Sequence, residues 1–325
     1  MISDFEYKKY REIKRLSLEE LNKYYRQLRK YEFENNKPLE SSKIKKKIHT
    51  LSMLILKIDR LLSNRKLIIY DDKRDNYKEL DRGKIYASSH VGRYDIESTM
   101  EAIDDQAYFV MGDPEETYRN FEGFYLNNIQ GRICMDTGYQ IFDLIQKQKN
   151  GENLSDSDKK LIEEYKIDRN LCQETCIRRV KNKDNILIYP EGAWNITPKL
   201  TQPLFKGTAR IAVRGDGIII PVGIIRDNKK YIVNIGKNFD VSGAGEKDID
   251  DITTELKEKI NSLKGEIIFS NDKIMKRSSM KSPKENEREF KEDIMRETTN
   301  GYTEEVIEKS RYYDKDAPEN VFKVR

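Results

Sequence analysis

The stretch NILIYPEGAWNITPKLTQPLFKGTARIAVRGDGIIIPVGIIRD, from Asn185 to Asp227, contains two apolar runs separated by a helical pattern. The runs are short and are bounded by glycine, aspartate or asparagine, as buried strands usually are. The helical pattern between them covers about 206–214. A strand, a helix and a second strand in this order predict a sheet with helices on its faces.

Further apolar runs of the same kind lie on both sides of this stretch. They read KLIIYDD from Lys66, KIYASS from Lys84, AYFVMG from Ala107, RICMD from Arg132 and KYIVNIGKNF from Lys230. Helical patterns over 96–103 and 115–128 separate several of them. We therefore predict an α/β fold, with a mixed, largely parallel sheet flanked by helices, in a domain over 66–265.

The preceding region, 1–65, is predicted to be a helical hairpin. Ser17 and Glu20 form a capping-box pattern at the start of its first helix. The second helix begins near Ser41 or Ser42, and its apolar residues recur at spacings of four and three, which is the pattern of a coiled-coil seam. The predicted seam contains Ile44, Ile48, Leu51, Ile55, Ile58 and Leu62.

Basic residues accompany this seam. They are Lys43, Lys45, Lys46, Lys47, Lys57, Arg60, Arg65 and Lys66. An apolar stripe with a basic flank is typical of a helix that lies on an anionic membrane surface. Alternatively, the stripe is used entirely in packing within the protein and the lysines form a solvated face. Both interpretations hold if the hairpin buries its apolar residues while the lysines contact lipid headgroups.

Two other segments are expected to lie outside the sheet. The region 140–183 is long and polar, and it predicts an inserted helical segment with Ser155 as a cap. The region 266–325 predicts a flexible linker and a charged helical tail.

The composition argues against several classes of protein. Lys+Arg 61 against Asp+Glu 57 gives a formal charge of +4, which does not indicate a nucleic-acid binder. No run approaches the ~18 apolar residues of a membrane span, and the N-terminus lacks the pattern of a secretory signal. We expect a cytoplasmic protein that could also bind peripherally to the inner face of the membrane. With three cysteines and two histidines, neither a metal site nor a disulfide framework is expected.

One of the two histidines lies in YASSHVGRYDIES, from Tyr86 to Ser98. His90 follows a predicted strand, where functional groups gather at the carboxyl edge of a sheet, and its ordinary pKa suits proton abstraction. Asp95 can reach it if Gly92 lets the chain turn, and it would then fix the imidazole tautomer. Alternatively, Asp95 only caps the following helix and His90 is a satisfied, half-buried ring.

A second group of candidate site residues follows the run NILI. Glu191 could supply a carboxylate for an acceptor hydroxyl, and the backbone N–H groups around Gly192 could bind an anion. Taken alone, each could equally belong to an ordinary turn.

Taken in order, these segments resemble the lysophospholipid/glycerolphosphate acyltransferase superfamily. HVGRYD resembles its HxxxxD motif, YPEGAWN its PEG-containing motif, IIIPVGI its proline-containing strand and FKGTARIA the segment between them, while NNIQGRICMDTG is a weaker match. The resemblance covers about 67–239. It implies transfer of a fatty acyl group from acyl-CoA or acyl-carrier protein to a hydroxyl, with no other cofactor. It also implies that His90 removes the hydroxyl proton, that Asp95 orients His90, and that Glu191 helps to hold the acceptor.

The sequence departs from the family pattern at two positions. Many members carry arginines, thought to hold the phosphate of the acceptor, where this chain has Thr137 and Trp194. Their absence removes bidentate phosphate recognition. Trp194 could be core packing, stack on a sugar ring or line the acyl entrance. Nearby basic residues could compensate in part or form a solvated face; they are Arg132, Lys199, Lys206 and Arg210.

Three functions therefore remain open. The first is an acyltransferase acting on a lipid or lipid precursor at the membrane surface. The second is an acyltransferase for a non-phosphorylated acceptor, such as a glycolipid, an aminolipid or another alcohol. The third is an inactive relative that binds lipid or a partner through the helical hairpin. The presence of His90, Asp95, Glu191 and Gly192 together argues against the third.

Overall fold

A computed structural model describes residues 8, 10–35, 42–74, 77, 80–92, 94–111, 132–134, 141–192, 201, 204–227 and 229–270. The strands are β1 (Lys66–Ile69), β2 (Lys84–Ser88), β3 (Ala107–Met111), β4 (Arg132–Cys134), β5 (Asn185–Ile188), β6 (Ile218–Asp227), β7 (Lys230–Ile235) and β8 (Phe239–Asp240). The helices are α1 (Tyr10–Ile13), α2 (Leu18–Asn35), α3 (Ser42–Leu62), α5 (Asp95–Ile103), α8 (Phe142–Lys149), α9 (Asp156–Lys181), α10 (Gly207–Gly215) and α11 (Ile249–Phe269), the last preceded by a 3-10 turn (Glu246–Asp248). The predicted helix over 115–128 and the predicted tail after 270 lie outside the described residues.

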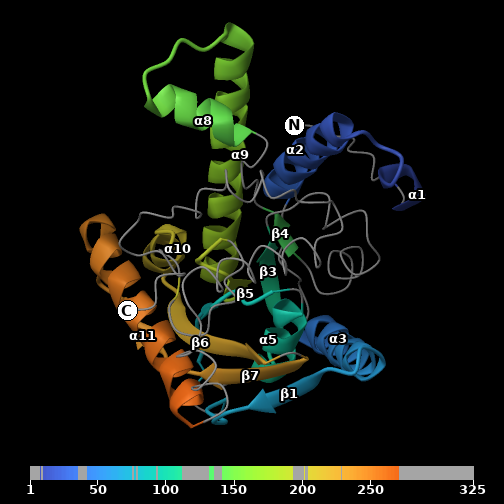
Figure 1. Cartoon of the computed structure of the whole chain (residues 1–325), viewed down its shortest axis with the longest axis vertical. Helices are drawn as coiled ribbons and strands as arrows, with labels where there is room; N and C mark the ends of the chain where they lie inside the picture. The colour runs from blue at the N-terminus through green and yellow to red at the C-terminus, as the bar shows by residue number, and fades with distance from the viewer. Residues whose placement is uncertain are drawn as a thin grey trace.

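The strands form one sheet in the order β1-β7-β6-β2-β5-β3-β4, with β8 paired to β6 (Figure 1). The pairs β1–β7, β6–β2, β2–β5, β5–β3 and β3–β4 are parallel. The pairs β6–β7 and β6–β8 are antiparallel. The predicted α/β fold with a mixed, largely parallel sheet is confirmed.

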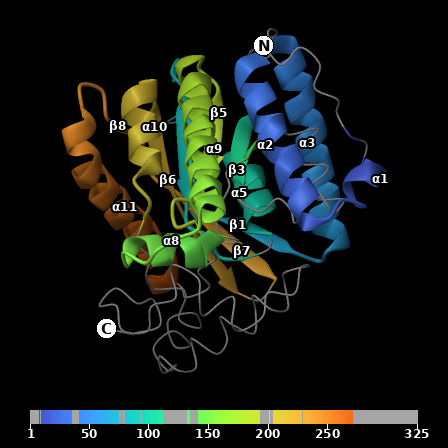
Figure 2. The same cartoon turned by 90° about the horizontal axis from the view of Figure 1, so that it is seen from above.

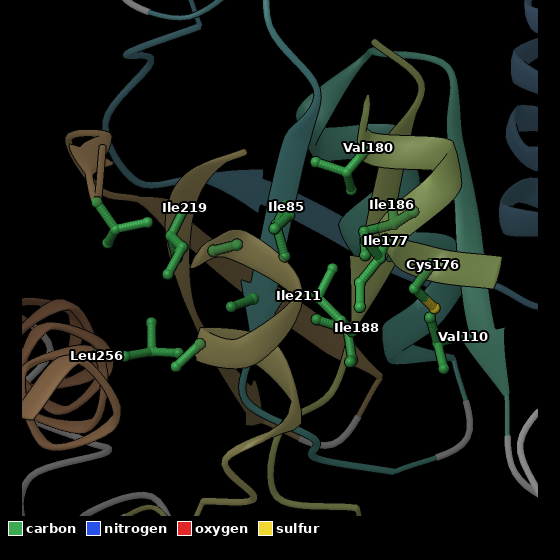
Figure 3. Close-up of a cluster of buried hydrophobic side chains, with 14 of the residues drawn as sticks. Ile85, Val110, Cys176, Ile177, Val180, Ile186, Ile188, Ile211, Ile219 and Leu256 are labelled. Carbon is green, nitrogen blue, oxygen red and sulfur yellow. The ribbon is translucent and has the colours of Figure 1, made fainter. Parts of the chain in front are cut away.

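Helices cover both faces of this sheet. Consecutive strand residues point to opposite faces, and β2 shows this clearly: Tyr86 packs in the core with α3 and α5, whereas Ile85 packs in the core with α9, α10 and α11. Figure 2 shows α9, α10 and α11 side by side along the second face. Figure 3 shows side chains from this second core, including Ile85, Ile211 and Leu256.

Helix α11 lies unusually close to the strand beneath it. A Cβ atom at Gly223 of β6 would lie 2.7 Å from Cβ of Leu263 and 2.9 Å from the backbone N of Lys264. We placed the end of the α/β domain at 265, but α11 continues to Phe269. It continues because Ile267 and Ile268 are buried against β6 and β7.

The two N-terminal helices pack on different parts of the fold. The capping box is confirmed, since Ser17 N–H donates to Glu20 (2.7 Å) and Glu20 N–H donates to Ser17 Oγ (3.2 Å). α2 packs on α9, where Arg29 forms a buried ion pair with Asp168. α3 packs on α5 instead. Each of the two helices thus contacts a helix of the α/β domain. The hairpin of the two helices stays a prediction.

The buried face of α3 differs from the predicted seam. Ser52, Met53 and Leu56 are buried, while Ile55 is half-buried. The exposed apolar side chains of this helix are Leu51, Leu54, Ile58, Leu61 and Leu62. The prediction that Leu51, Ile58 and Leu62 are buried is therefore wrong. Helix α3 carries apolar residues on two opposite sides, and the side that faces the core is the one with Met53 and Leu56. The side chains of Ile44 and Ile48 are not among those that the structure describes.

The predicted segment over 140–183 is helical, and the predicted cap at Ser155 is confirmed. Its hydroxyl accepts a hydrogen bond from Asp158 N–H at 3.2 Å. The second half of α9 covers the sheet, with Cys172, Cys176 and Val180 buried in the core. None of the helices within the described ranges is long and apolar enough to cross a membrane.

Candidate active site

The topology brings two loops to one edge of the sheet. β2 and β5 are parallel neighbours in which Ala87 pairs with Ile188, so both chains leave the sheet at the same edge. The loop after β2 is anchored by Ser89, which is buried. Ser89 N–H donates to the Val222 carbonyl (3.1 Å), and its Oγ accepts the N–H of Ile224 (3.0 Å). The backbone that enters the next residue, His90, is therefore fixed.

His90 and Asp95 form a hydrogen-bonded pair. Nδ1 of His90 lies 2.7 Å from Oδ2 of Asp95, whose side chain is almost fully buried. The same oxygen accepts the N–H groups of Val91 (2.5 Å) and Gly92 (3.1 Å). These N–H groups belong to the loop and precede α5, so Asp95 orders the loop in addition to facing the imidazole.

The turn between the two residues depends on Gly92. Its φ is +125°, a conformation that side chains other than glycine rarely adopt. The expectation that Gly92 lets Asp95 turn back toward His90 is confirmed. Because Nδ1 faces a carboxylate, the neutral imidazole carries its hydrogen on Nδ1 and its lone pair on Nε2.

Tyr189 lies against the imidazole. The two rings are stacked, with centroids 4.3 Å apart and planes inclined by 28°. Burial, with a further contribution from the Asp95 carboxylate, raises the pKa of Tyr189 well above its ordinary value, so the phenol stays neutral. The sequence analysis missed this residue. An aromatic residue directly after the apolar run NILI was the available signal.

Glu191 is fully buried and contacts the backbone of His90. Its Oε1 accepts the His90 N–H at 3.0 Å. The following residue, Gly192, has φ +65°, and its N–H donates to the Tyr189 carbonyl at 3.0 Å. We predicted either an anion site at the backbone N–H groups around Gly192 or an ordinary turn. The N–H of Gly192 itself is used within the turn, which needs the glycine for its backbone conformation.

Lys264 of α11 is a further buried cation, and the sequence analysis missed it. Its side chain is fully buried. Burial lowers its pKa to about 8, and the carboxylate of Glu191 acts in the opposite direction. Sequence reasoning could not place it because α11 was not predicted. The glycines of the strands, such as Gly223, were the signal that a helix backbone approaches the sheet closely.

The remaining predicted residues lie elsewhere or outside the described side chains. Trp194 and Thr137 are outside the described residues, and Arg132 is described only as the first residue of β4. Lys206 is exposed and forms an ion pair with Asp250 at 2.6 Å. Arg210, on the next turn, lies 3.5 Å from Glu246.

The described residues contain no cluster of three or more His, Cys, Asp or Glu side chains that could hold a metal ion. The site contains an imidazole with the buried carboxylate of Asp95 behind it and the buried carboxyl group of Glu191 on its backbone. An imidazole oriented in this way can remove a proton from a hydroxyl.

Comparison with known proteins supports the fold. No family model and no curated protein matches this sequence. The solved structure of the 1-acyl-sn-glycerophosphate (LPA) acyltransferase, PlsC, from Thermotoga maritima matches it with 13% identity and a TM-score of 0.50. The match covers 75% of this chain and 88% of that one. At this identity the likeness establishes a shared α/β architecture, and the function has to be argued from the site.

Proposed function

We propose that this protein transfers a fatty acyl group from an acyl-CoA or acyl-carrier protein thioester to a hydroxyl of a lipid or lipid precursor. The observation that carries the proposal is the 2.7 Å contact between His90 Nδ1 and the buried Oδ2 of Asp95. Two other findings support it. The motifs around His90, Glu191 and Pro221 resemble those of one acyltransferase superfamily, and an acyltransferase shares the fold.

In the proposed reaction, Nε2 of His90 takes the proton from the acceptor hydroxyl as its oxygen attacks the thioester carbonyl. Asp95 stabilises the resulting imidazolium. The tetrahedral intermediate then collapses, the carbon–sulfur bond breaks, and the thiolate takes the proton from His90. The products are an ester and a free thiol.

Glu191 is proposed to position the imidazole. The resemblance implied that it holds the acceptor, but its hydrogen bond to the His90 backbone supports a contribution through the base itself. An ionised carboxylate makes a shorter and stronger hydrogen bond to an N–H group than a neutral acceptor does.

A non-phosphorylated acceptor is the second candidate, and the surface around α10 favours it. The cations considered as substitutes for the two missing arginines include Lys206 and Arg210. Both face carboxylates, Asp250 and Glu246. Their charges are thus partly compensated by the protein, which weakens the case for a phosphate on the acceptor.

The proposed place of action is an anionic membrane surface. Helix α3 exposes Leu51, Leu54, Ile58 and Leu61, which are spaced so that they share one face. Exposed lysines of the same helix include Lys47 and Lys57. An exposed apolar stripe with basic neighbours supports peripheral binding from the cytoplasmic side.

The experiment that tests the proposal is thiol release from acyl-CoA and from acyl-carrier protein in the presence of mixed lipid and alcohol acceptors. We expect thiol release that depends on an acceptor, and an ester product identifiable by mass. Purified, folded protein that releases no thiol with either donor and any acceptor would contradict the proposal and support an inactive, lipid-binding relative.

A further inference from the structure

The first turn of helix α5 carries Asp95 but has no side-chain cap. The N-cap residue is Tyr94, whose side chain makes no capping hydrogen bond. The usual caps are serine, threonine, aspartate and asparagine, whose oxygen atoms fix the start of a helix. Asp95 does not replace such a cap, because its Oδ2 accepts N–H groups of the preceding loop and faces His90. The place of Asp95 therefore depends on what packs against this end of α5.

The guanidinium group of Arg65 lies over the ring of Tyr94. Its Cζ is 4.4 Å from the ring centroid, and only 2% of the Arg65 side chain is exposed. A cation over an aromatic face is attracted by the ring, and the attraction is stronger where water is excluded. Arg65 thus holds the residue that immediately precedes Asp95.

Arg65 is itself fixed by the end of helix α3. Its Nε donates to Ser63 Oγ at 2.7 Å, and its guanidinium forms an ion pair with Asp59 of the last helical turn. Its backbone N–H donates to the Arg60 carbonyl at 3.0 Å. The sequence analysis placed Arg65 in the basic flank of this helix, but the side chain is buried. These contacts orient the flat guanidinium that meets the ring of Tyr94.

A second contact ties the same two helices together near the other end of α5. The Nε–H of Arg60 donates to both carboxylate oxygens of Glu101, at 3.0 and 2.9 Å, and Glu101 is buried. Figure 1 shows α3 beside α5, on which it packs. Glu101 lies about 9 Å along the helix axis from Asp95. This pair therefore fastens α3 to α5 at a distance from the dyad.

We infer that Arg65 is a positioning residue of the acyl-transfer site. Stacked on Tyr94, it holds the first turn of α5, from which Asp95 reaches the imidazole of His90. The inference rests on the proposed function, in which His90 removes a proton. Arg65 does not touch the reacting atoms. Its contribution is the fixed geometry of imidazole and carboxylate, and a displacement of about 1 Å can lower a rate about 100-fold.

The two arginines distinguish this role from general packing between the helices. Arg60 and Arg65 both come from the end of α3 and both contact α5, but of the two it is Arg65 that contacts the turn beside Asp95. If both only fasten the helices, replacing either with methionine should have the same kind of effect. If Arg65 positions Asp95, its replacement should alter the pair with His90 and that of Arg60 should not.

The first test measures which ring nitrogen of His90 carries the hydrogen. The chain has two histidines, so protein labelled with 15N-histidine gives few signals, and His49→Gln assigns them. At about pH 9 an imidazole of ordinary pKa is neutral. In wild type the hydrogen should then be on Nδ1, because this nitrogen faces Asp95. An imidazole that loses its carboxylate partner exchanges between both tautomers, which moves the two ring-nitrogen signals toward each other.

We expect the ratio of the Nδ1–H to the Nε2–H form to fall at least about threefold in Arg65→Met, which is the lower end of what a cation over a ring contributes. Arg65→Lys keeps the charge but loses the flat fork, so its ratio should lie between those of wild type and Arg65→Met. Arg60→Met is the matched control and should leave the ratio unchanged.

An unchanged ratio in folded Arg65→Met would overturn the inference. An equal change in Arg60→Met would do so as well, and so would a wild-type His90 without its hydrogen on Nδ1. If Arg65→Met does not fold, Tyr94→Leu removes the same contact from its other side and is judged by the same ratio.

The second test uses turnover and a double-mutant cycle. We expect Arg65→Met to lower kcat about tenfold, with KM for acyl-CoA changed less than about threefold, and Arg60→Met to keep kcat within about threefold of wild type. In an Asp95→Asn background, Arg65→Met should lower kcat less than about twofold further, because the contact that it supports is already lost. Full additivity of the two changes would overturn the inference. If wild-type protein releases no thiol, the proposed function fails, whereas the tautomer ratio still decides whether Arg65 positions the pair.

Discussion

The ring of Tyr189 stacks on the imidazole of His90, with a centroid distance of 4.3 Å and an angle of 28° between the planes. The stack holds the imidazole from one face, while Asp95 holds it through Nδ1. Two constraints of different kinds therefore fix one ring. Such fixation lowers the entropic cost of bringing Nε2 to the acceptor hydroxyl.

The stack predicts that the ring of Tyr189 matters more than its hydroxyl. Tyr189→Phe keeps the ring, and we expect its kcat to stay within about twofold of wild type. Tyr189→Leu removes the stacking, which is worth about 0.5–1.5 kcal/mol, so kcat should fall roughly twofold to twelvefold. Steady-state kinetics with thermal unfolding of each variant checks this. Equal kcat values for the two variants would contradict the assigned role.

The pair of His90 and Asp95 predicts two severe variants. His90→Ala should lower turnover by about 100- to 10,000-fold, because a general base contributes in that range. Asp95→Asn should also be severe, since an amide cannot stabilise the imidazolium as a carboxylate does. A matched control is Asp104→Asn at the other end of α5, where the left-handed backbone suits asparagine. Wild-type turnover in either of the first two variants would refute the dyad.

Much of the site could be predicted from sequence because its signals are local. The runs that became β2, β5 and β6 are short and apolar, and His90 and Glu191 follow the first two within three residues. Gly92 indicated the turn that brings Asp95 back. Parallel neighbours then place both loops at one edge, which follows from the βαβ pattern.

Other features could not be predicted because they depend on tertiary packing. A lysine in a polar helical pattern normally lies in solvent, and only the close approach of α11 at Gly223 places Lys264 inside. Helix α3 has two apolar stripes on opposite sides, one with the heptad pattern and one that contains Met53 and Leu56. The second stripe packs against the core, so the predicted burial of Leu51 was wrong.

The residues at the two departures from the family pattern predict acceptor preference. With Thr137 and Trp194 in place of arginines, lysophosphatidic acid and glycerol 3-phosphate should be poor acceptors compared with a non-phosphorylated alcohol. Competition assays with equal concentrations of each acceptor measure this. Thr137→Arg with Trp194→Arg should improve phosphate-bearing acceptors. Efficient acylation of either phosphate by wild type, with saturation at low concentration, would overturn the prediction.

The lowered pKa of Lys264 predicts how stability depends on pH. With a pKa of about 8 in the folded state and about 10.4 in the unfolded state, Lys264 binds fewer protons when folded. Its unfavourable contribution is complete below about pH 8 and is relieved as pH rises toward 10.4. The free energy of unfolding of wild type, relative to Lys264→Met with Glu191→Gln, should therefore increase by up to about 1.4 kcal/mol per pH unit. Urea unfolding from pH 7.5 to 10 measures it, and a constant or shrinking difference would contradict the buried charge.

The exposed face of α3 predicts binding to lipid. Leu51, Leu54, Ile58 and Leu61 form an apolar stripe in contact with solvent, and an anionic bilayer would cover it while the lysines meet its headgroups. Because each nearby lysine adds about 1 kcal/mol and salt screens this attraction, binding should be reversible and salt-sensitive. Anionic vesicles should bind the protein at low salt, and neutral vesicles should bind it negligibly.

Two sets of variants separate the apolar from the electrostatic part of this binding. Leu54→Gln with Ile58→Gln should weaken binding at every salt concentration, because burial of each apolar side chain contributes about 1.5–3 kcal/mol. Changing Lys45, Lys46 and Lys47 to glutamate should weaken it mainly at low salt. Ile167→Gln is the matched control, since Ile167 is an equally exposed apolar residue on α9. Co-sedimentation decides the matter: no binding to anionic vesicles at low salt, or an equal loss with Ile167→Gln, would refute α3 as the membrane-binding face and favour a soluble acceptor.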